Sequence, residues 1–240
     1  GVGAARGVRV IDAGRLRAAL EEAGERLDEA ARRAGRPPGA VELVLAGKYV
    51  DPADTEALIA AGVRVVGENR LQDLRARRAV AGDRLAFDFI GHLQRRKAKE
   101  VMPAIRLLHS LDSARLAGEI ARRVEGPVRV LVEVNAGEEE TKGGIVPGQL
   151  RVFVEDVSAH PDLVIGGLMT MPPAHTDPEQ SRPYFAAVRR LGADLADEWR
   201  GRHDVRDLSM GTSQDYLVAA EEGATMVRLG RGLLARAEGA

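Results

Sequence analysis

Short apolar runs alternate with amphipathic stretches along the chain from residue 41 onward. The apolar runs have the length and the bounding turn residues of buried strands, and they lie at residues 41–48, 63–68, 86–91, 105–111, 128–135, 163–171, 207–211 and 225–230. The stretches between them predict helices at residues 53–61, 69–80, 94–102, 113–124, 147–159, 178–199 and 214–222. Strict alternation of this kind is typical of a parallel sheet, and eight units fit a closed (β/α)8 TIM barrel.

An open, doubly wound sheet is the alternative fold. That fold normally carries a G-x-G-x-x-G turn after its first strand, and none follows residues 41–48. An additional amphipathic helix is predicted at residues 14–34, before the first strand. Few residues follow the last predicted strand, so we expect this N-terminal helix to take the place of a helix after strand eight.

Composition favours one globular unit. The chain has 240 residues with no linker or internal repeat, so we expect a single domain over residues 1–240, with a frayed leader at residues 1–7. The net charge of −1 provides no global attraction for nucleic acid or an anionic membrane. The absence of cysteine excludes disulfides, thiolate metal sites and a cysteine nucleophile. The sequence has neither a transmembrane stretch nor the apolar core of a signal peptide, so we expect a cytoplasmic protein.

The first strand ends in a lysine, Lys48. Burial at the rim of an apolar core would disfavour the ammonium form and leave a nucleophilic amine, which is how a lysine is prepared to form a Schiff base. The alternative is a lysine that reaches into water and covers apolar surface with its stem.

Small hydroxyl residues and glycines gather after the seventh and eighth strands. Ser209, Thr212 and Ser213 stand at the end of the seventh strand, and Gly230 and Arg231 follow the eighth. Phosphate sites in barrels commonly use these two loops, where glycine lets backbone N–H groups approach an anion. A capped turn would explain the same residues, so the phosphate site is a hypothesis at this point.

Arg228 lies within the apolar eighth strand and needs a partner if it points inward. One candidate partner is a pyridine nitrogen, because pyridoxal phosphate sites place Asp or Arg at that atom. The other is an ion pair with Glu133 or Asp207.

Four further polar residues lie at strand ends. Asn69 and Asn135 can each form hydrogen bonds with a ligand or fix a loop. For His92 and His109 we expect structural roles, because a lone histidine beside a strand usually has its hydrogen bonds satisfied locally.

Several motifs together resemble the YggS-like pyridoxal phosphate homeostasis proteins, over nearly the whole chain and in order. The motifs are residues 67–69 (GEN), 89–94 (FIGHLQ), 109–112 (HSLD), 167–169 (GLM), 208–213 (LSMGTS) and 226–230 (MVRLG). The resemblance implies a single barrel similar to the N-terminal domain of alanine racemase, with pyridoxal 5'-phosphate (PLP) held as a Schiff base on Lys48. It also implies a phosphate site formed by Ser209, Thr212, Ser213, Gly230 and Arg231, with Arg228 facing the pyridine nitrogen.

The predicted site has nine cofactor-binding residues, no catalytic residue and no metal. The nine are Lys48, Asn69, Met169, Ser209, Thr212, Ser213, Arg228, Gly230 and Arg231. An arginine at the pyridine nitrogen would leave that nitrogen unprotonated and weaken the ring as an electron sink.

The chain departs from the family pattern at three places. Residues 46–48 read Ala-Gly-Lys instead of Val-Ser-Lys, Tyr49 follows, and Arg231 stands where the family often has a small hydroxyl residue. The acidic loop at residues 138–144, which contains Lys142, matches the family's loop after strand five; the alternative is an ordinary solvated loop.

Three functions remain open from the sequence. The first is a PLP-binding protein of vitamin B6 homeostasis, monomeric, that holds PLP for apo-enzymes without efficient catalysis. The second is a PLP-dependent amino-acid racemase, although only Lys48 is an obvious acid or base and a racemase needs one on each face of its substrate. The third is a phosphate-binding aldolase or isomerase that uses Lys48 on a sugar carbonyl.

Overall fold

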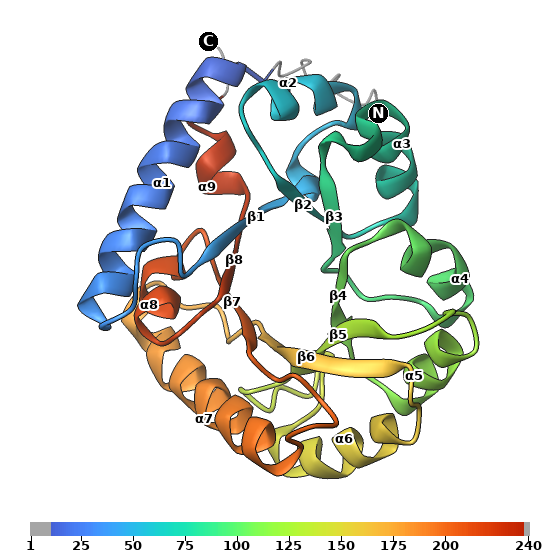
Figure 1. The fold of residues 1–240 in the computed structure, drawn as a ribbon. Helices are drawn as coiled ribbons and strands as arrows, with labels where there is room; N and C mark the ends of the chain where they lie inside the picture. The colour runs from blue at the N-terminus through green and yellow to red at the C-terminus, as the bar shows by residue number, and fades with distance from the viewer. Residues whose placement is uncertain (1–10, 238–240) are drawn as a thin grey trace, which may run out of the picture.

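Each apolar run of the sequence becomes one strand of a closed parallel barrel (Figure 1). The computed structural model describes residues 11–237, so the leader expected at residues 1–7 lies outside them. The strands are β1 (Glu42–Ala46), β2 (Val65–Glu68), β3 (Ala86–Phe89), β4 (Leu107–Leu111), β5 (Val128–Val134), β6 (Leu163–Thr170), β7 (Asp207–Thr212) and β8 (Met226–Leu229). They follow one another in sequence order, and β8 pairs with β1 to close the sheet. The predicted barrel is confirmed.

Helices surround the barrel on its outer side (Figure 1). The α-helices are α1 (Ala13–Arg33), α2 (Thr55–Ala60), α3 (Leu71–Ala81), α4 (Ala98–Val101), α5 (Ala114–Ala121), α6 (Leu150–Ser158), α7 (Arg182–Glu198), α8 (Tyr216–Glu221) and α9 (Arg231–Leu234). Short 3-10 helices are η1 (Gly47–Tyr49), η2 (Pro52–Asp54), η3 (Gly82–Arg84), η4 (Arg95–Lys97), η5 (Met102–Ala104), η6 (Pro147–Gln149) and η7 (Pro178–Ser181). Helix α9 was not predicted, because four residues give no readable periodicity.

Helix α1 fills the gap in the helical ring between α8 and α2 (Figure 1). The short helix α9 lies between α1 and the barrel. Asp12 caps its N-terminus by accepting a hydrogen bond from the Arg15 N–H at 2.8 Å. Leu16 and Leu27 lie on its buried face. The N-terminal helix therefore takes the place of a long helix after β8, as the sequence predicts.

Two apolar layers hold the barrel. The larger one lies between the strands and the surrounding helices and includes Leu45, Val66, Leu108 and Val227. The smaller one fills the barrel interior with Val44, Val65, Leu107, Leu131, Met169 and Met226. The alternation of side chains along each strand sends successive residues to these two layers, so the barrel is a packed core rather than a pore.

Within residues 11–237, no helix is long and apolar enough to cross a membrane. Over the same residues, His, Asp and Glu side chains do not come together in any group of three or more that could hold a metal ion.

His203 fastens the segment before β7 to its neighbours. Its Nδ1 accepts a hydrogen bond from the Ile165 N–H at 3.2 Å, and its Nε2 lies 2.8 Å from Ser158 Oγ. Ser158 donates its own hydroxyl hydrogen to the Val154 carbonyl at 2.6 Å, so Nε2 must donate to Ser158. Burial, with Arg202 nearby, lowers the pKa of His203 to about 4. The imidazole is therefore neutral in the folded protein.

We expect His203 to make the protein less stable as the pH falls from 6.5 toward 4. An unfolded histidine with a pKa near 6.5 takes up a proton over that window, whereas folded His203 does not. The loss should reach roughly 2–3 kcal/mol. Urea unfolding of the wild type and of His203→Gln, which keeps one donor and one acceptor, measures the difference. The partly exposed His160→Gln is the control, and equal pH slopes for the wild type and His203→Gln would contradict the assignment.

Candidate cofactor-binding site at the C-terminal mouth of the barrel

A cavity opens where the strands end. Its volume of about 490 Å³ lies within the usual range for small-molecule sites. Its lining residues are Ala46, Lys48, Tyr49, Asn69, Ile90, Met171, Thr212, Ser213, Gln214, Arg228, Gly230, Arg231, Gly232 and Ala235. Three of them, Lys48, Arg228 and Arg231, are basic, and this lining set contains no Asp or Glu. The cavity therefore suits an anionic ligand of small size.

Lys48 lies two residues after the end of the first strand, in the turn that follows it. It lies in the 3-10 helix Gly47–Tyr49, and its Nζ is 4.9 Å from the centre of the Tyr49 ring. The side chain is exposed, so of the two alternatives for Lys48 the structure shows the lysine that reaches toward water. The strand ends at Ala46, and the tight turn that follows carries Lys48 out of the apolar layer and into the cavity lining.

The fully buried Arg77 of α3 holds the turn that carries Lys48. Its Nη2 donates to the carbonyls of Gly47 at 3.3 Å and Val50 at 3.0 Å. Its Nη1 reaches Thr55 Oγ1 at 3.3 Å, and its Nε forms a 2.7 Å ion pair with Glu68. The planar guanidinium thus joins the turn after β1 to the end of β2 in one fixed geometry.

Glu68 and Gly47 fit against each other at the same place. Burial raises the pKa of Glu68, although the Arg77 hydrogen bond opposes that rise. A Cβ at Gly47 would lie 2.6 Å from Glu68 Oε1 and 2.9 Å from Val66 Cγ1. Glycine at position 47 therefore leaves room for the buried carboxylate, which would have to shift if a side chain replaced it here.

The loops after β7 and β8 form the opposite side of the cavity. Ser213 Oγ accepts a hydrogen bond from the Gly230 N–H at 3.3 Å, and Asp215 accepts one from the Thr212 N–H at 2.7 Å. A Cβ at Gly230 would come within 2.5 Å of the Tyr49 ring. The Arg231 guanidinium carbon lies 5.5 Å from the centre of the same ring. The loops are thus tied to each other and to the turn of Lys48.

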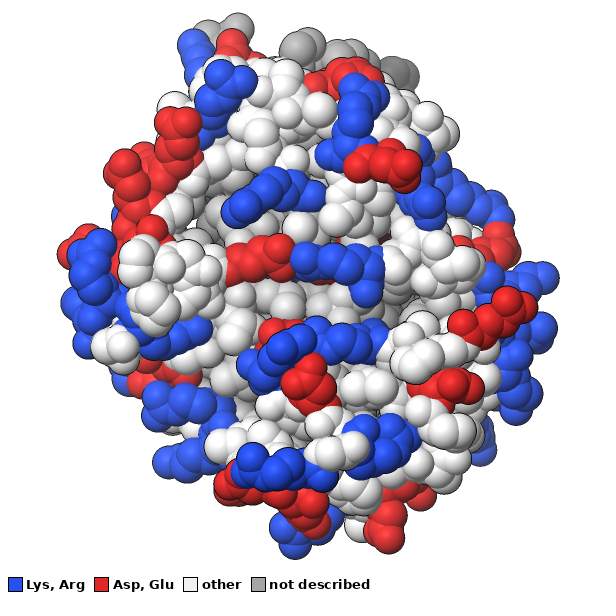
Figure 2. Space-filling view, in the orientation of Figure 1, with Lys and Arg blue, Asp and Glu red and all other residues white. Residues whose placement is uncertain are grey.

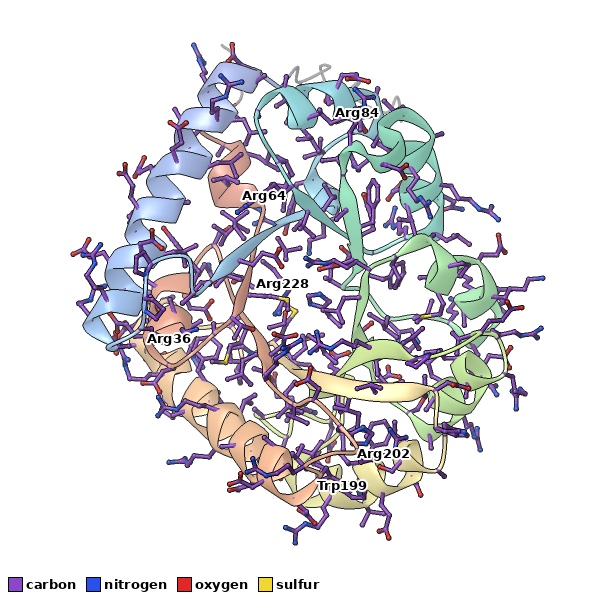
Figure 3. The ribbon with its side chains drawn as sticks, in the orientation of Figure 1. Arg36, Arg64, Arg84, Trp199, Arg202 and Arg228 are labelled. Atoms are coloured by element: carbon purple, nitrogen blue, oxygen red, sulfur yellow. The ribbon has the colours of Figure 1, made fainter. Side chains whose placement is uncertain are left out.

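Arg228 lies in the centre of the barrel, at the floor of the cavity (Figure 3). Its Nη1 donates to the carbonyl of Ser209 at 2.7 Å and to its Oγ at 2.6 Å, and its Nη2 donates to the Thr170 carbonyl at 2.8 Å. Burial lowers the pKa of Arg228 to about 10, so it stays charged at neutral pH. The ion pair considered with Glu133 or Asp207 is not formed, and Asp207 instead pairs with Arg129 at 3.1 Å.

The nine residues predicted to bind the cofactor fall into two groups. Seven line the cavity: Lys48, Asn69, Thr212, Ser213, Gly230, Arg231 and Arg228. Ser209 and Met169 do not; Ser209 is fully buried beneath Arg228, and Met169 belongs to the apolar cluster inside the barrel. Two residues further along the chain, just after the end of β6, Met171 reaches the cavity instead. Positions two apart share a face, so sequence reasoning chose the right face but one layer too deep.

The two asparagines differ in what they contact. Asn69 lines the cavity, and its Oδ1 is buried without a hydrogen-bond partner among the described residues. Asn135 exchanges hydrogen bonds with the backbone of Glu139 at 2.9 and 3.2 Å and so fixes the loop after β5. Asn69 therefore offers a polar atom to a ligand, whereas Asn135 has a structural role.

The acidic loop after β5 is attached to its neighbour rather than free in solvent. Lys142 donates to the carbonyl of Pro172, in the loop after β6, at 3.1 Å and pairs with Glu139 at 2.6 Å. His92, at the exposed rim of the mouth, pairs with Asp112 at 2.8 Å.

Comparisons with known proteins identify the family. Residues 19–235 match the model of the alanine racemase N-terminal domain. The chain is 42% identical to a pyridoxal phosphate homeostasis protein of Aquifex aeolicus (strain VF5), over 86% of this chain and 91% of that protein. The chain belongs to the pyridoxal phosphate homeostasis protein family.

Two solved structures are similar to this family member. A protein of unknown function from Bifidobacterium adolescentis has a TM-score of 0.83 at 31% identity, covering 92% of this chain and 96% of that one. PipY of Synechococcus elongatus PCC7942, solved with PLP bound, has a TM-score of 0.73 at 30% identity, covering 88% of this chain and 99% of that one. The recognition of the family from its sequence motifs is confirmed.

Sequence reasoning missed several residues that shape the site of this family member. Tyr49 follows Lys48 directly, and that adjacency was the only signal for it. Arg77 gave none, since one arginine among several on an amphipathic helix looks like a solvated residue.

We expect Arg77→Met to lower the free energy of unfolding by about 3–5 kcal/mol, because it leaves Glu68 buried without its counter-ion. Arg78→Met, an exposed neighbour on the same helix, should change it little. Chemical denaturation of both variants makes the measurement. The double variant Arg77→Met/Glu68→Leu should recover part of the loss. Equal stabilities of the Arg77 and Arg78 variants would contradict the stabilising role of the buried ion pair between Arg77 and Glu68.

Proposed function

We propose that this protein binds pyridoxal 5'-phosphate as a Schiff base on Lys48 and acts as a single-domain protein in PLP homeostasis, holding the cofactor rather than turning over a substrate efficiently. One observation carries the proposal. The amine of Lys48, the buried Arg228 and the hydroxyl, glycine and arginine residues of the loops after β7 and β8 line the same cavity. The family supports it, because its relatives carry the name of this function and PipY has PLP bound.

The residues of the cavity fit the parts of PLP. Lys48 provides an amine for the aldehyde. Thr212, Ser213, Gly230 and Arg231 provide hydroxyl groups, backbone without a Cβ and a cation for the phosphate. Asn69 provides a buried polar atom that has no partner in the protein. These assignments use six of the predicted residues, and Arg228, which Ser209 holds from below, is the seventh.

Arg228 makes efficient catalysis on bound PLP unfavourable. Bound PLP supplies an electron sink when its ring nitrogen is protonated, and a charged arginine at that nitrogen opposes protonation. The hydrogen bonds of Arg228 to Ser209 and Thr170 hold its guanidinium in place at the cavity floor. Lys48 and Tyr49, the two lining groups that can exchange a proton, come from one turn, whereas a racemase needs groups on opposite faces.

We expect a monomer in the cytoplasm that passes PLP to apo-enzymes and does not bind nucleic acid; the net charge of −1 supports the last point.

The central prediction concerns the site of attachment. Protein purified with PLP should absorb in the visible range, and borohydride reduction should fix the cofactor to one of the four lysines of the chain, Lys48. Lys48→Ala should lose the absorbance and the labelled peptide, whereas the exposed Lys99→Ala should keep both. Labelling of Lys97, Lys99 or Lys142 instead, or of none, would refute the proposal.

A separate prediction concerns turnover. PLP-loaded protein incubated with a panel of L- and D-amino acids should show no appreciable racemisation by chiral chromatography, because acid and base groups are lacking on opposite faces. A PLP-dependent racemase assayed in parallel is the positive control. Substantial turnover of any amino acid that disappears in Lys48→Ala would favour the racemase alternative.

A further inference from the structure

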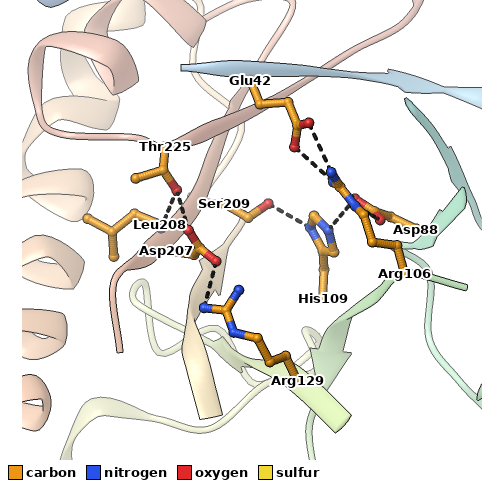
Figure 4. Close-up of polar contacts among 9 residues, drawn as sticks. All are labelled: Glu42, Asp88, Arg106, His109, Arg129, Asp207, Leu208, Ser209 and Thr225. Atoms are coloured by element: carbon orange, nitrogen blue, oxygen red, sulfur yellow. Dashed lines mark hydrogen bonds and ion pairs between the residues drawn. The ribbon is translucent and has the colours of Figure 1, made fainter. Parts of the chain in front are cut away.

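A chain of polar side chains crosses the barrel interior from Arg228. Figure 4 shows its course from Ser209 through His109 and Asp88 to Arg106. Arg228 Nη1 lies 2.6 Å from Ser209 Oγ, and the same oxygen lies 2.8 Å from His109 Nδ1. The other ring nitrogen of His109, Nε2, lies 3.0 Å from Asp88 Oδ2. Three strands, β8, β7 and β4, therefore contribute one continuous set of contacts that reaches β3.

The chain continues to the other mouth of the barrel. Arg106 donates to both carboxylate oxygens of Asp88 at 3.0 and 2.8 Å and to both oxygens of Glu42 at 2.9 and 2.8 Å (Figure 4). The side chains of Arg106 and Glu42 are partly exposed. Figure 2 shows basic and acidic side chains next to each other over this opening. The polar chain therefore links the cofactor cavity to solvent on the opposite side.

The hydrogen atoms of the chain can be placed from its donors and acceptors. Arg228 only donates, so Ser209 Oγ accepts from it and has its single hydrogen free to donate to His109 Nδ1. His109 then carries its proton on Nε2 and donates it to Asp88, which accepts from Arg106 as well. The contacts are all satisfied when His109 is neutral in its Nε2–H form.

The charges agree with this placement. His109 is fully buried and faces Asp88, Arg106 and Arg228; burial lowers its pKa, more than Asp88 raises it. Burial alone would raise the pKa of Asp88, but the hydrogen bonds from His109 and Arg106 outweigh it and lower that pKa. A neutral imidazole thus lies between the Asp88 carboxylate and the hydroxyl group that holds Arg228.

We propose that His109 is a positioning residue, fixed by Asp88 as the Nε2–H tautomer, which orients the Ser209 hydroxyl so that Arg228 presents its guanidinium to the cavity in one geometry. Arg228 has five N–H donors, and its three bonds to the barrel wall leave two that can be directed at a ligand. The proposal rests on the proposed function, because it assigns to His109 the placement of the group that would face the PLP ring nitrogen.

The first test needs no cofactor. Nitrogen-15 NMR of protein labelled at its five histidines distinguishes the tautomers, and the signal lost in His109→Gln identifies His109. We expect a neutral Nε2–H ring from pH 6 to 8. A protonated ring or an Nδ1–H tautomer at neutral pH would overturn the assignment, whether or not the protein binds PLP.

The second test measures the effect on bound cofactor. His109→Leu removes both ring contacts and should weaken PLP binding by about tenfold or more, the usual effect of disturbing a hydrogen bond to a charged group. It should also shift the visible band of the bound cofactor and the pH at which that band titrates. His109→Gln, whose amide can accept from Ser209 and donate to Asp88, should restore the wild-type values, and His160→Gln is the control.

The outcomes separate the two proposals. If the wild type forms no Lys48-linked cofactor, the proposed function fails while the tautomer measurement still tests the polar chain. If His109→Leu lowers the melting temperature but keeps the wild-type spectrum, titration and affinity, His109 is only a core residue and the positioning role is overturned. Failure of His109→Gln to restore the spectrum, in a folded protein, would also count against it.

Discussion

The pairing of the first strand with the last is the constraint on which this structure depends. Val44 lies beside Arg228 and Leu45 beside Leu229 in the parallel register of β1 and β8. That register brings the turn carrying Lys48 against the loop carrying Gly230, although most of the chain lies between them. Tyr49 shows how close the approach is, because a Cβ at Gly230 would meet its ring at 2.5 Å. Without closure of the barrel, the amine of Lys48 and the loops after β7 and β8 would not share one cavity.

Two buried arginines hold the segments that barrel closure brings together. Arg77 lies outside the barrel wall and binds backbone carbonyls of the Lys48 turn, and Arg228 lies inside it and binds carbonyls of β6 and β7. A buried charge is tolerated only when it is hydrogen-bonded, so each arginine holds its surroundings in one geometry. Main-chain carbonyls therefore hold both arginines, in addition to the side-chain hydrogen bonds that tie the rim loops.

The regular parts of this protein were readable from the sequence, and the irregular parts were not. Eight strands and the N-terminal helix followed from periodicity, because burial on one or two faces leaves a repeating pattern. Lys48, Gly230 and Arg231 could be predicted to lie together at one mouth, where they line the cavity, because strand ends in a parallel barrel gather there. Ser209 and Met169 were placed one layer too deep, since alternation gives the face of a strand residue and not its height in the barrel. Lys48 is exposed because a 3-10 turn, which has no periodicity to read, follows the strand.

The sequence by itself determined which elements form, their order, and the family to which they belong, because these depend on local patterns and short motifs. The tertiary structure decided the partners of the charged residues. Asp88, Arg106 and His109 come from segments with no shared motif, and only their common position inside the barrel shows that they form one chain with Arg228. Hydrogen bonding between distant residues depends on distances of about 3 Å and on the direction of each donor. The register of the closed sheet sets these distances and directions, and the spacing of residues along the chain does not predict them.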